Sequence, residues 1–387
     1  MLKSHHKQCC EESIFKMDAN SLKREAESLP SVPLKAATSY HAHSDELIQF
    51  VNDSLTADAD INALIGNAPL QKMYDNHKHH AQFMATVFSL NEYDILVRTL
   101  PWVYRTYHSH NFSYDYFSAA LKQWMAGVEK FLDPANAEPI LWVYRWLMDM
   151  HKQIIAVAES DNLEPPPVHP DWIQKKSAFQ AALLSGDHHH CLDIAEEMIH
   201  DSSGIEQFYS QIVQPSLYEI GMLWERAEIS VAQEHLASAI VGRVMAAVGM
   251  NHLKPSEVKG KAVITASPNE FHEIGAWMIS DTLEQDGWDV KYLGANTPQE
   301  DLIDMLLAFQ PQVLAVSVTM SFNILKVRAL IQEIRNTPKL DSLRIMVGGR
   351  VFNEQPDLWR EIGGDGFASN LEEAKHLATQ WHGSKNL

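Results

Sequence analysis

The stretch with the clearest chemical potential is Glu270-Phe271-His272-Glu273-Ile274-Gly275. It follows an apolar run at residues 261–266 and opens an apolar-periodic segment that ends near Leu283, which predicts a strand, a short loop and a helix. A neutral imidazole after a parallel strand, with Glu270 two residues before it, suits a metal ligand whose second ring nitrogen is held by an acid. A lone histidine after a strand is more often a surface or capping residue, so the choice between these roles and a metal ligand depends on the surrounding elements.

The surrounding sequence, residues 258–387, predicts a doubly wound parallel sheet, because short apolar runs alternate with amphipathic segments. Ligands of such sheets bind at the carboxyl ends of the strands. Three features fall there: His272, the hydroxyls of Ser317 and Thr319, and the pair Gly348-Gly349. We expect strands at 261–266, 289–293, 313–318, 344–347 and 366–368, and helices at 273–285, 298–309, 323–336 and 356–362.

Residues 171–255 carry the pattern of a four-helix bundle, with helices expected at 171–185, 191–200, 205–225 and 231–249. A capping box at residues 230–233 starts the last helix and puts Glu234 and His235 in its first turns. The preceding helix ends near Trp224, so we expect these three side chains to converge at one end of the bundle. Structural roles alone would explain either the tryptophan or the acid.

The N-terminal part is predicted to be a tail at residues 1–38, an all-helical domain at 39–160 and a proline-rich linker at 161–170. Helices are expected at 45–55, 70–88, 93–108, 114–131 and 140–157, with breaks at Pro101, Asp133-Pro134 and Glu138-Pro139. Aromatic residues recur at helical spacing there, which is typical of a core. The alternative is a planar ligand, whose carboxylates would meet Arg98, Arg105 or Arg145.

Composition excludes several classes of protein. The net charge of -19 over 387 residues, without a basic cluster, argues against nucleic-acid binding. Three cysteines provide neither a disulfide framework nor a multi-cysteine metal site, and no apolar run is long enough to cross a membrane. We therefore expect a cytoplasmic protein with no membrane partner. The histidines at 77, 79, 80 and 188–190 are interpreted as solvated surface residues.

The order of these motifs resembles the cobalamin-binding proteins of the methionine-synthase type. Their motif is Asp-x-His-x-x-Gly, then Ser-x-Leu or Ser-x-Thr, then Gly-Gly, in a flavodoxin-like domain behind a four-helix cap. The resemblance implies that His272 is the lower axial cobalt ligand and that the cofactor's tail lies along Gly275, Ser317, Thr319, Gly348 and Gly349. One departure is Glu270, which stands where the motif has Asp, so its bond to the histidine could be looser or pass through water.

The cap resembles that of the cobalamin-dependent photoreceptors, in which the counterparts of Trp224, Glu234 and His235 pack around an adenosyl group. This resemblance implies adenosylcobalamin as a chromophore, photolysis of its cobalt-carbon bond, and His235 as the candidate ligand at the freed upper position. It also implies a homo-oligomer whose assembly responds to light. The sequence does not identify a downstream effector.

The helical domain ahead of the cap makes the arrangement most like the photocobilins, which pair a cobalamin module with a bilin. By that resemblance residues 39–160 form a globin-like domain that binds biliverdin. Two rival functions remain open: a corrinoid methyl-carrier serving partner methyltransferases, and a haem-binding redox sensor. The sensor hypothesis includes no catalytic residue, and the absence of a partner catalytic domain in this chain favours it over the carrier.

Overall fold

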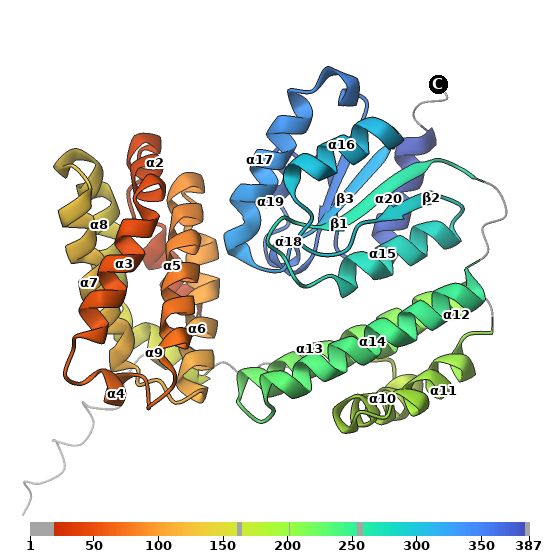
Figure 1. The fold of residues 1–387 in the computed structure, drawn as a ribbon, viewed down its shortest axis with the longest axis horizontal. Helices are drawn as coiled ribbons and strands as arrows, with labels where there is room; N and C mark the ends of the chain where they lie inside the picture. Colours follow the sequence, from red (N-terminus) through yellow and green to blue (C-terminus); the bar gives the residue numbers. More distant parts are fainter. Residues whose placement is uncertain (1–18, 161–164, 201, 254–257, 384–387) are drawn as a thin grey trace, which may run out of the picture. The chain divides into compact units, whose positions relative to one another are not determined.

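The computed structural model describes residues 19–160, 165–200, 202–253 and 258–383. The chain divides into two compact units, residues 1–162 and 163–387 (Figure 1). Within the described ranges, no helix is long and apolar enough to cross a membrane. Residues 161–164 of the expected linker lie outside the described residues.

The first unit is all-helical, as expected. Its helices are α1 (Ala19–Ala26), α2 (Leu34–Ala42), α3 (Ser44–Thr56), α4 (Ile61–Leu64), α5 (Leu70–Leu90), α6 (Tyr93–Ser109), α7 (Asp115–Phe131), α8 (Pro134–Asp149) and α9 (His151–Ser160). The predicted break at Asp133-Pro134 is confirmed, because the Asp133 side chain accepts a hydrogen bond from the amide of Asn136 and Pro134 occupies the first turn of α8. The single helix expected at 140–157 is wrong in its bounds, since α8 already begins at Pro134 and a separate helix, α9, begins at His151.

The tail bounds and both proline breaks were predicted wrongly in this unit. The tail was expected to reach residue 38, but α1 and α2 are helices whose Leu22 and Tyr40 are buried in the core, so the tail prediction fails from residue 19 onward. Residues 1–18 lie outside the described part. Pro101 and Pro139 lie inside α6 and α8 and do not break them. Tertiary packing outweighs the local cost of a helical proline here, and Pro101 is itself buried.

The core of the first unit is built from hydrogen-bonded aromatic side chains. Tyr40 and Tyr144 share a hydrogen bond of 2.7 Å, and His80 contacts the Tyr144 hydroxyl at 3.1 Å. Trp124 stacks on Tyr144, and both are buried. His77, expected on the surface, is fully buried, with Nδ1 2.6 Å from an asparagine oxygen. The prediction of solvated histidines was therefore wrong for His77, whereas those at 188–190 are exposed.

The second unit begins with the predicted four-helix bundle, here called the cap. Its helices are α10 (Ile173–Ser185), α11 (His188–Met198), α12 (Ser202–Phe208) continued through a π-helical turn (Tyr209–Val213) into α13 (Gln214–Glu225), and α14 (Val231–His252). Both halves of the predicted capping box at Ser230 and Gln233 are formed. The expected third helix thus contains a π-turn, a feature that often marks functional sites.

The rest of the second unit is the predicted parallel sheet, in the order β2-β1-β3-β4-β5. Its strands are β1 (Lys261–Ala266), β2 (Asp289–Tyr292), β3 (Val313–Ser317), β4 (Arg344–Gly348) and β5 (Gly366–Ala368). Its helices are α15 (Ile274–Gln285), α16 (Gln299–Phe309), α17 (Ile324–Arg335), α18 (Arg350–Glu354), α19 (Leu358–Glu361) and α20 (Leu371–Gly383), and α18 and α20 were not anticipated. Figure 1 shows α15 and α20 on one face of the sheet and α16 and α17 on the other.

The strand order changes direction between β1 and β3, because β2 lies outside β1 while β3, β4 and β5 follow on the other side. The loop that contains His272 leaves β1 at this switch point, and the Ser317 loop leaves β3 next to it. Residue pairing aligns Ala266 with Ser317, and Ser317 with Gly348. The fold therefore brings the three predicted features to one edge of the sheet.

Candidate functional site

The site is centred on His272, whose side chain is 60% exposed while its partner Glu270 is 1% exposed. The Nδ1 atom of His272 lies 2.5 Å from Oε1 of Glu270. Because the carboxylate can only accept, Nδ1 carries the proton and Nε2 keeps its lone pair free. The longer side chain of glutamate thus makes a direct contact, and the looser bond considered from the sequence is not observed.

The second carboxylate oxygen of Glu270 is fully engaged by the segment after β3. It accepts hydrogen bonds from the amides of Thr319 (3.0 Å) and Met320 (2.9 Å) and from Nδ2 of Asn323 (3.1 Å). Burial would raise the pKa of the Glu270 carboxyl, but hydrogen bonds from His272 and the two amides outweigh burial and hold the pKa below its usual value. Glu270 therefore stays ionised and keeps the imidazole in one tautomer.

Three asparagines fix the loop that carries His272. Asn269 and Asn296 both have positive φ angles, of 66° and 51°, which asparagine tolerates better than most residues. Oδ1 of Asn296 accepts a hydrogen bond of 2.8 Å from the Asn269 amide. Asn323 exchanges hydrogen bonds with Asn269 and is fully buried. Sequence reasoning missed all three, because their partners lie 27 to 54 residues away in the chain.

Two of the predicted glycines have different roles at the sheet edge. A Cβ atom on Gly275 would meet only the Ser317 hydroxyl, at 3.9 Å, so the first turn of α15 faces free space next to that serine. Gly349 has a φ of 97°, and a Cβ there would lie 2.5 Å from the Val318 carbonyl oxygen, so this position requires glycine. Thr319 contributes its amide to Glu270, in addition to the hydroxyl considered from the sequence.

A second imidazole stands on the cap. The Nδ1 atom of His235 lies 2.6 Å from Oε2 of Glu234, and the Ser238 hydroxyl donates to the other oxygen of Glu234 at 2.9 Å. The His235 side chain is 73% exposed, so its Nε2 atom is available to a ligand. Trp224 is half-buried and stands one residue before the end of α13, at the turn that leads into α14. Ser238 was not anticipated, although its spacing from Glu234 is that of adjacent helical turns.

The start of α14 extends past the start of α15, the helix that follows the His272 loop. Figure 1 shows α14 and α15 running in the same direction, and a Cβ on Gly242 of α14 would lie 3.6 Å from the Trp277 ring of α15. Gly242 is eleven residues into α14, whereas Trp277 is only three residues into α15. At 1.5 Å per residue, the start of α14 therefore reaches about 12 Å beyond the start of α15. Glu234 and His235 lie on this overhanging segment.

In the described part of the chain, no three His, Cys, Asp or Glu side chains gather as a metal site. A metal that enters with its own equatorial ligands needs only one protein nitrogen on each face. His272 on the sheet and His235 on the cap each offer one such nitrogen.

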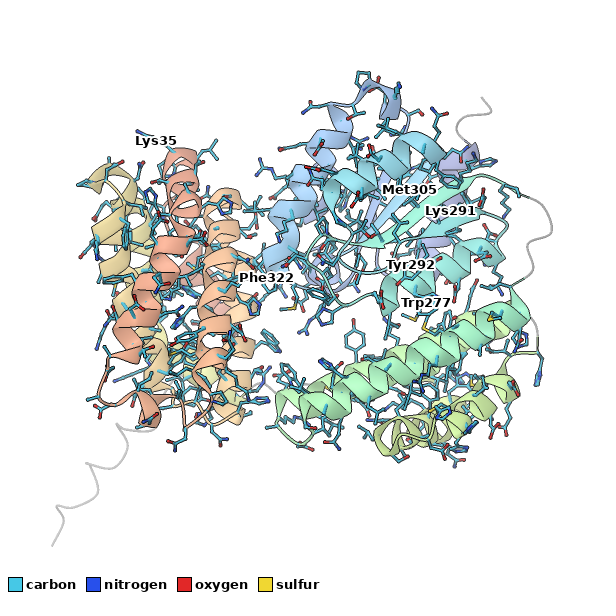
Figure 2. All side chains as sticks on the ribbon, viewed as in Figure 1. Lys35, Trp277, Lys291, Tyr292, Met305 and Phe322 are labelled. Carbon is cyan, nitrogen blue, oxygen red and sulfur yellow. The ribbon has the colours of Figure 1, made fainter. Side chains whose placement is uncertain are left out.

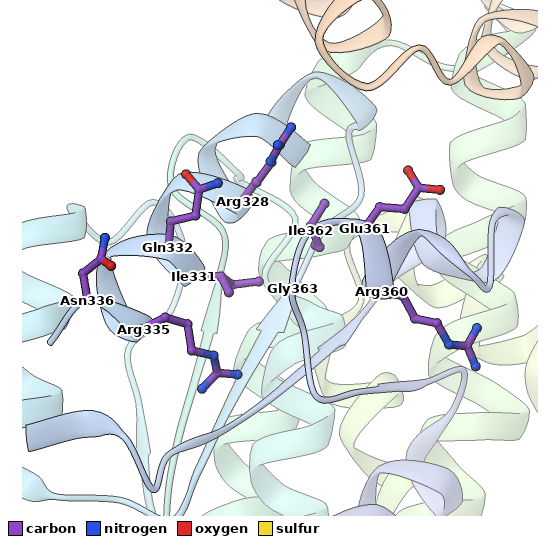
Figure 3. A pocket seen from close by; sticks show the side chains of 9 residues that line it. All are labelled: Arg328, Ile331, Gln332, Arg335, Asn336, Arg360, Glu361, Ile362 and Gly363. Carbon is purple, nitrogen blue, oxygen red and sulfur yellow. The ribbon is translucent and has the colours of Figure 1, made fainter. Parts of the chain in front are cut away.

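A separate concavity of about 340 Å³ lies between α17 and the turn after α19 (Figure 3). It opens beside the segments that lead into β4 and β5, so it is at the opposite edge of the sheet from His272. Arg335 and Arg360 stand in the last turns of α17 and α19, where basic side chains match the negative end of a helix dipole. We therefore do not include it in the candidate site.

Comparison with known families identifies the cap and the sheet. Residues 260–375 match a B12 binding domain, and residues 177–248 match a second B12 binding domain model. These two matches cover the elements that carry the two imidazoles and the glycines, and they support a cobalamin-binding protein.

Individual relatives fall into two groups. The chain is 29% identical to the HTH-type transcriptional repressor CarH of Myxococcus xanthus over 146 residues, 38% of this chain and 48% of CarH, so it spans about half of that relative. It is 27% identical to CarA of the same organism, over 58% of this chain and 73% of CarA. Monomethylamine corrinoid protein 2 of Methanosarcina acetivorans is 24% identical over 49% of this chain and 88% of that protein. The solved monomethylamine corrinoid protein of Methanosarcina barkeri aligns with a TM-score of 0.48 at 19% identity, covering 54% of this chain and 99% of that one.

Proposed function

We propose that this protein is a light sensor that binds adenosylcobalamin between its cap and its parallel sheet. The observation that carries the proposal is the pair of exposed imidazoles, His272 and His235, each with Nδ1 held by a carboxylate at 2.5 and 2.6 Å. Both rings thereby present Nε2, the nitrogen that coordinates a metal when the other is hydrogen-bonded. His272 would hold the cobalt from the side of the sheet, and His235 would be available to it from the side of the cap.

The remaining site residues fit the same cofactor. Gly275 leaves open space at the carboxyl edge, where the tail of the cofactor would lie against Ser317 and Thr319. Above the corrin, Trp224 and Glu234 would border the adenosyl group. When bound, adenosylcobalamin supplies visible absorption and a cobalt-carbon bond that light breaks.

The protein's own response is expected in the cap. The ring of His235, which is exposed and bonded to its neighbour Glu234, would be available to the cobalt from the cap side once the adenosyl group has left. Movement of the overhanging start of α14 would then change a surface of the cap. We propose that this surface governs the assembly of copies of the chain in response to light, without any catalytic step, and that a separate effector reads the assembly.

The alternative is a corrinoid methyl-carrier, favoured by the similarity to a monomethylamine corrinoid protein over most of its length. His272 would serve both functions, but a carrier has no evident need for the Glu234-fixed His235. The cap motif therefore favours the sensor.

An absorption experiment tests the proposal. Protein loaded with adenosylcobalamin in the dark should show the spectrum of a histidine-ligated, base-off cofactor, and green light should change it within one exposure. His272→Ala should lose the dark spectrum, whereas His235→Ala should keep it and give a different product after light. If illumination leaves the spectrum unchanged and the protein accepts a methyl group from a donor, the sensor proposal is wrong and the methyl-carrier function is supported. Size-exclusion chromatography before and after illumination tests the change of assembly.

Biliverdin in the first unit is the second part of the proposal. Three polar atoms there are buried without a partner, namely Gln82 Oε1, Thr106 Oγ1 and Trp146 Nε1, and a bilin's pyrroles and carbonyls could satisfy such groups. All three arginines considered from the sequence already have partners. Arg98 pairs with Asp94 and Arg145 with Glu138, each at its closest approach below 3 Å, and Arg105 donates to the Ala158 carbonyl at 3.4 Å. A red absorption band on adding biliverdin, lost on deleting residues 1–160, would support the second chromophore.

A further inference from the structure

The cap and the sheet domain meet along α15. Met278 belongs to the buried apolar cluster of the cap, and Ile274 and Trp277 pack against that cluster. Gly242 of α14 allows the Trp277 ring to approach, and Trp277 in turn stacks on Tyr292 of β2 (Figure 2). Apolar contact of this kind holds two layers together but is not directional, so it does not fix their relative position.

One polar contact lies inside this apolar junction. The hydroxyl of Tyr209 donates to Oδ2 of Asp281 at 2.5 Å, and the two residues are 0% and 4% exposed. The Trp277 side chain provides a second hydrogen bond to the same carboxyl group. Because leaving either Tyr209 or Asp281 buried without its partner is costly, this bond specifies one arrangement of the two layers.

The position of the bond connects the two faces of the cofactor site. Tyr209 opens the π-helical turn that continues into α13, the helix that ends beside Trp224. Asp281 lies two turns into α15, the helix that begins immediately after the His272 loop. The bond therefore ties the helix that leads to the upper face to the helix that starts at the lower ligand.

We propose that Tyr209 and Asp281 are positioning residues that hold the cap at the correct place over the cofactor. The proposal rests on cobalamin binding but not on the response to light. Neither residue touches the candidate site itself, so both act through α13 and α15.

A pH dependence follows from the surroundings of Asp281. Burial raises the pKa of Asp281 to about 7, and Glu284 on the same helix adds to the shift while Tyr209 opposes it. Among the described residues, Tyr292 of β2, bonded to Glu273, also faces this carboxyl group, and the Glu206–Lys375 ion pair spans the same junction. Since the folded pKa lies above the unfolded value of 3.8, the contribution of Asp281 to stability is greatest at low pH and falls as the pH rises from about 4 to about 7.

The test compares Tyr209→Phe, Asp281→Asn and the control Lys375→Gln in the full chain. Lys375→Gln removes an ion pair at the same junction that is partly exposed, at 38% and 29%, and worth little. Adenosylcobalamin is titrated in the dark at pH 6 and pH 8. We expect Tyr209→Phe to bind about tenfold more weakly at both pH values, Asp281→Asn to lose part of the pH dependence of the wild type, and Lys375→Gln to match the wild type.

Equal affinities of Tyr209→Phe and wild type, or identical pH dependence in Asp281→Asn, would overturn the proposal. Failure of the wild type to bind cobalamin would instead refute the proposed function. The positioning role of Tyr209 and Asp281 can then still be tested by hydrogen exchange on the cofactor-free protein. Amide hydrogen exchange in α14 and α15 should be faster in Tyr209→Phe than in wild type and Lys375→Gln. Unchanged exchange contradicts the positioning role.

Discussion

Replacing Glu270 with Gln is the sharpest test of the His272 side of the site, because it changes one carboxylate oxygen into an amide nitrogen while the side chain keeps its size. In the wild type, one carboxylate oxygen accepts from His272 and the other accepts from three donors in the segment after β3. A glutamine amide has a single accepting oxygen and a donating nitrogen. It can therefore satisfy one side only.

The structure indicates which of these two sets of hydrogen bonds the glutamine would give up. If the amide nitrogen faced Thr319, Met320 and Asn323, three donors would lose their acceptor, at about 1–3 kcal/mol for each buried group. If it faces His272 instead, the ring needs only to move its proton from Nδ1 to Nε2. The second outcome costs less. It leaves the fold intact but protonates the nitrogen that should coordinate cobalt.

We therefore expect Glu270→Gln to fold normally and to bind adenosylcobalamin about 10- to 100-fold more weakly, or about 1.4–2.8 kcal/mol, without the histidine-ligated spectrum. Titration followed by absorption measures both effects, and Glu300→Gln on exposed α16 is the control. Wild-type affinity together with a histidine-ligated spectrum in Glu270→Gln would refute the assignment of Glu270 as the residue that sets the tautomer.

Three further predictions concern the sheet, the cap and the first unit. Gly349→Ala should destabilise the sheet by about 1–3 kcal/mol and abolish cobalamin binding, because its φ is 97° and its Cβ would meet a backbone oxygen, whereas Gly275→Ala should fold normally and only weaken binding. Ser230→Ala removes the N-cap hydrogen bond of α14 and should lower the free energy of unfolding by about 1 kcal/mol, as measured by chemical denaturation. Burial lowers the pKa values of His77 and His80 to about 3, so the first unit should lose stability as the pH falls from about 6.5 toward 3, measurable as a falling melting temperature.

The sheet could be predicted from the sequence because its signals are local. Alternation of apolar runs with amphipathic segments located all five strands to within one or two residues, and parallel topology then brings His272, Ser317 and Gly348 together. The cap was equally predictable, since the capping box marks the start of α14. Local signals failed where packing overrides them, as at Pro101, which a buried helix accommodates.

The polar contacts that orient the site could not be predicted, because they join distant residues. Asn323 bonds Glu270 across 53 positions, and Tyr209 bonds Asp281 across 72. No spacing rule relates such pairs, and each residue taken alone has an ordinary local explanation, such as a helix start for Asn323. The proposed ligand residues can thus be suggested by motifs, while the residues that hold their loops in place require the fold.

The glutamate at position 270 changes how the lower ligand is held. Its carboxylate reaches His272 through one oxygen and the segment of Thr319, Met320 and Asn323 through the other, so one buried group joins the ligand loop to the segment beside the expected tail site. A shorter aspartate at this position would have to give up one of these contacts or draw the two loops closer. It follows that substitutions at Asn323, which touches neither the imidazole nor Ser317 in the observed contacts, should still alter the orientation of His272, because Glu270 transmits the change.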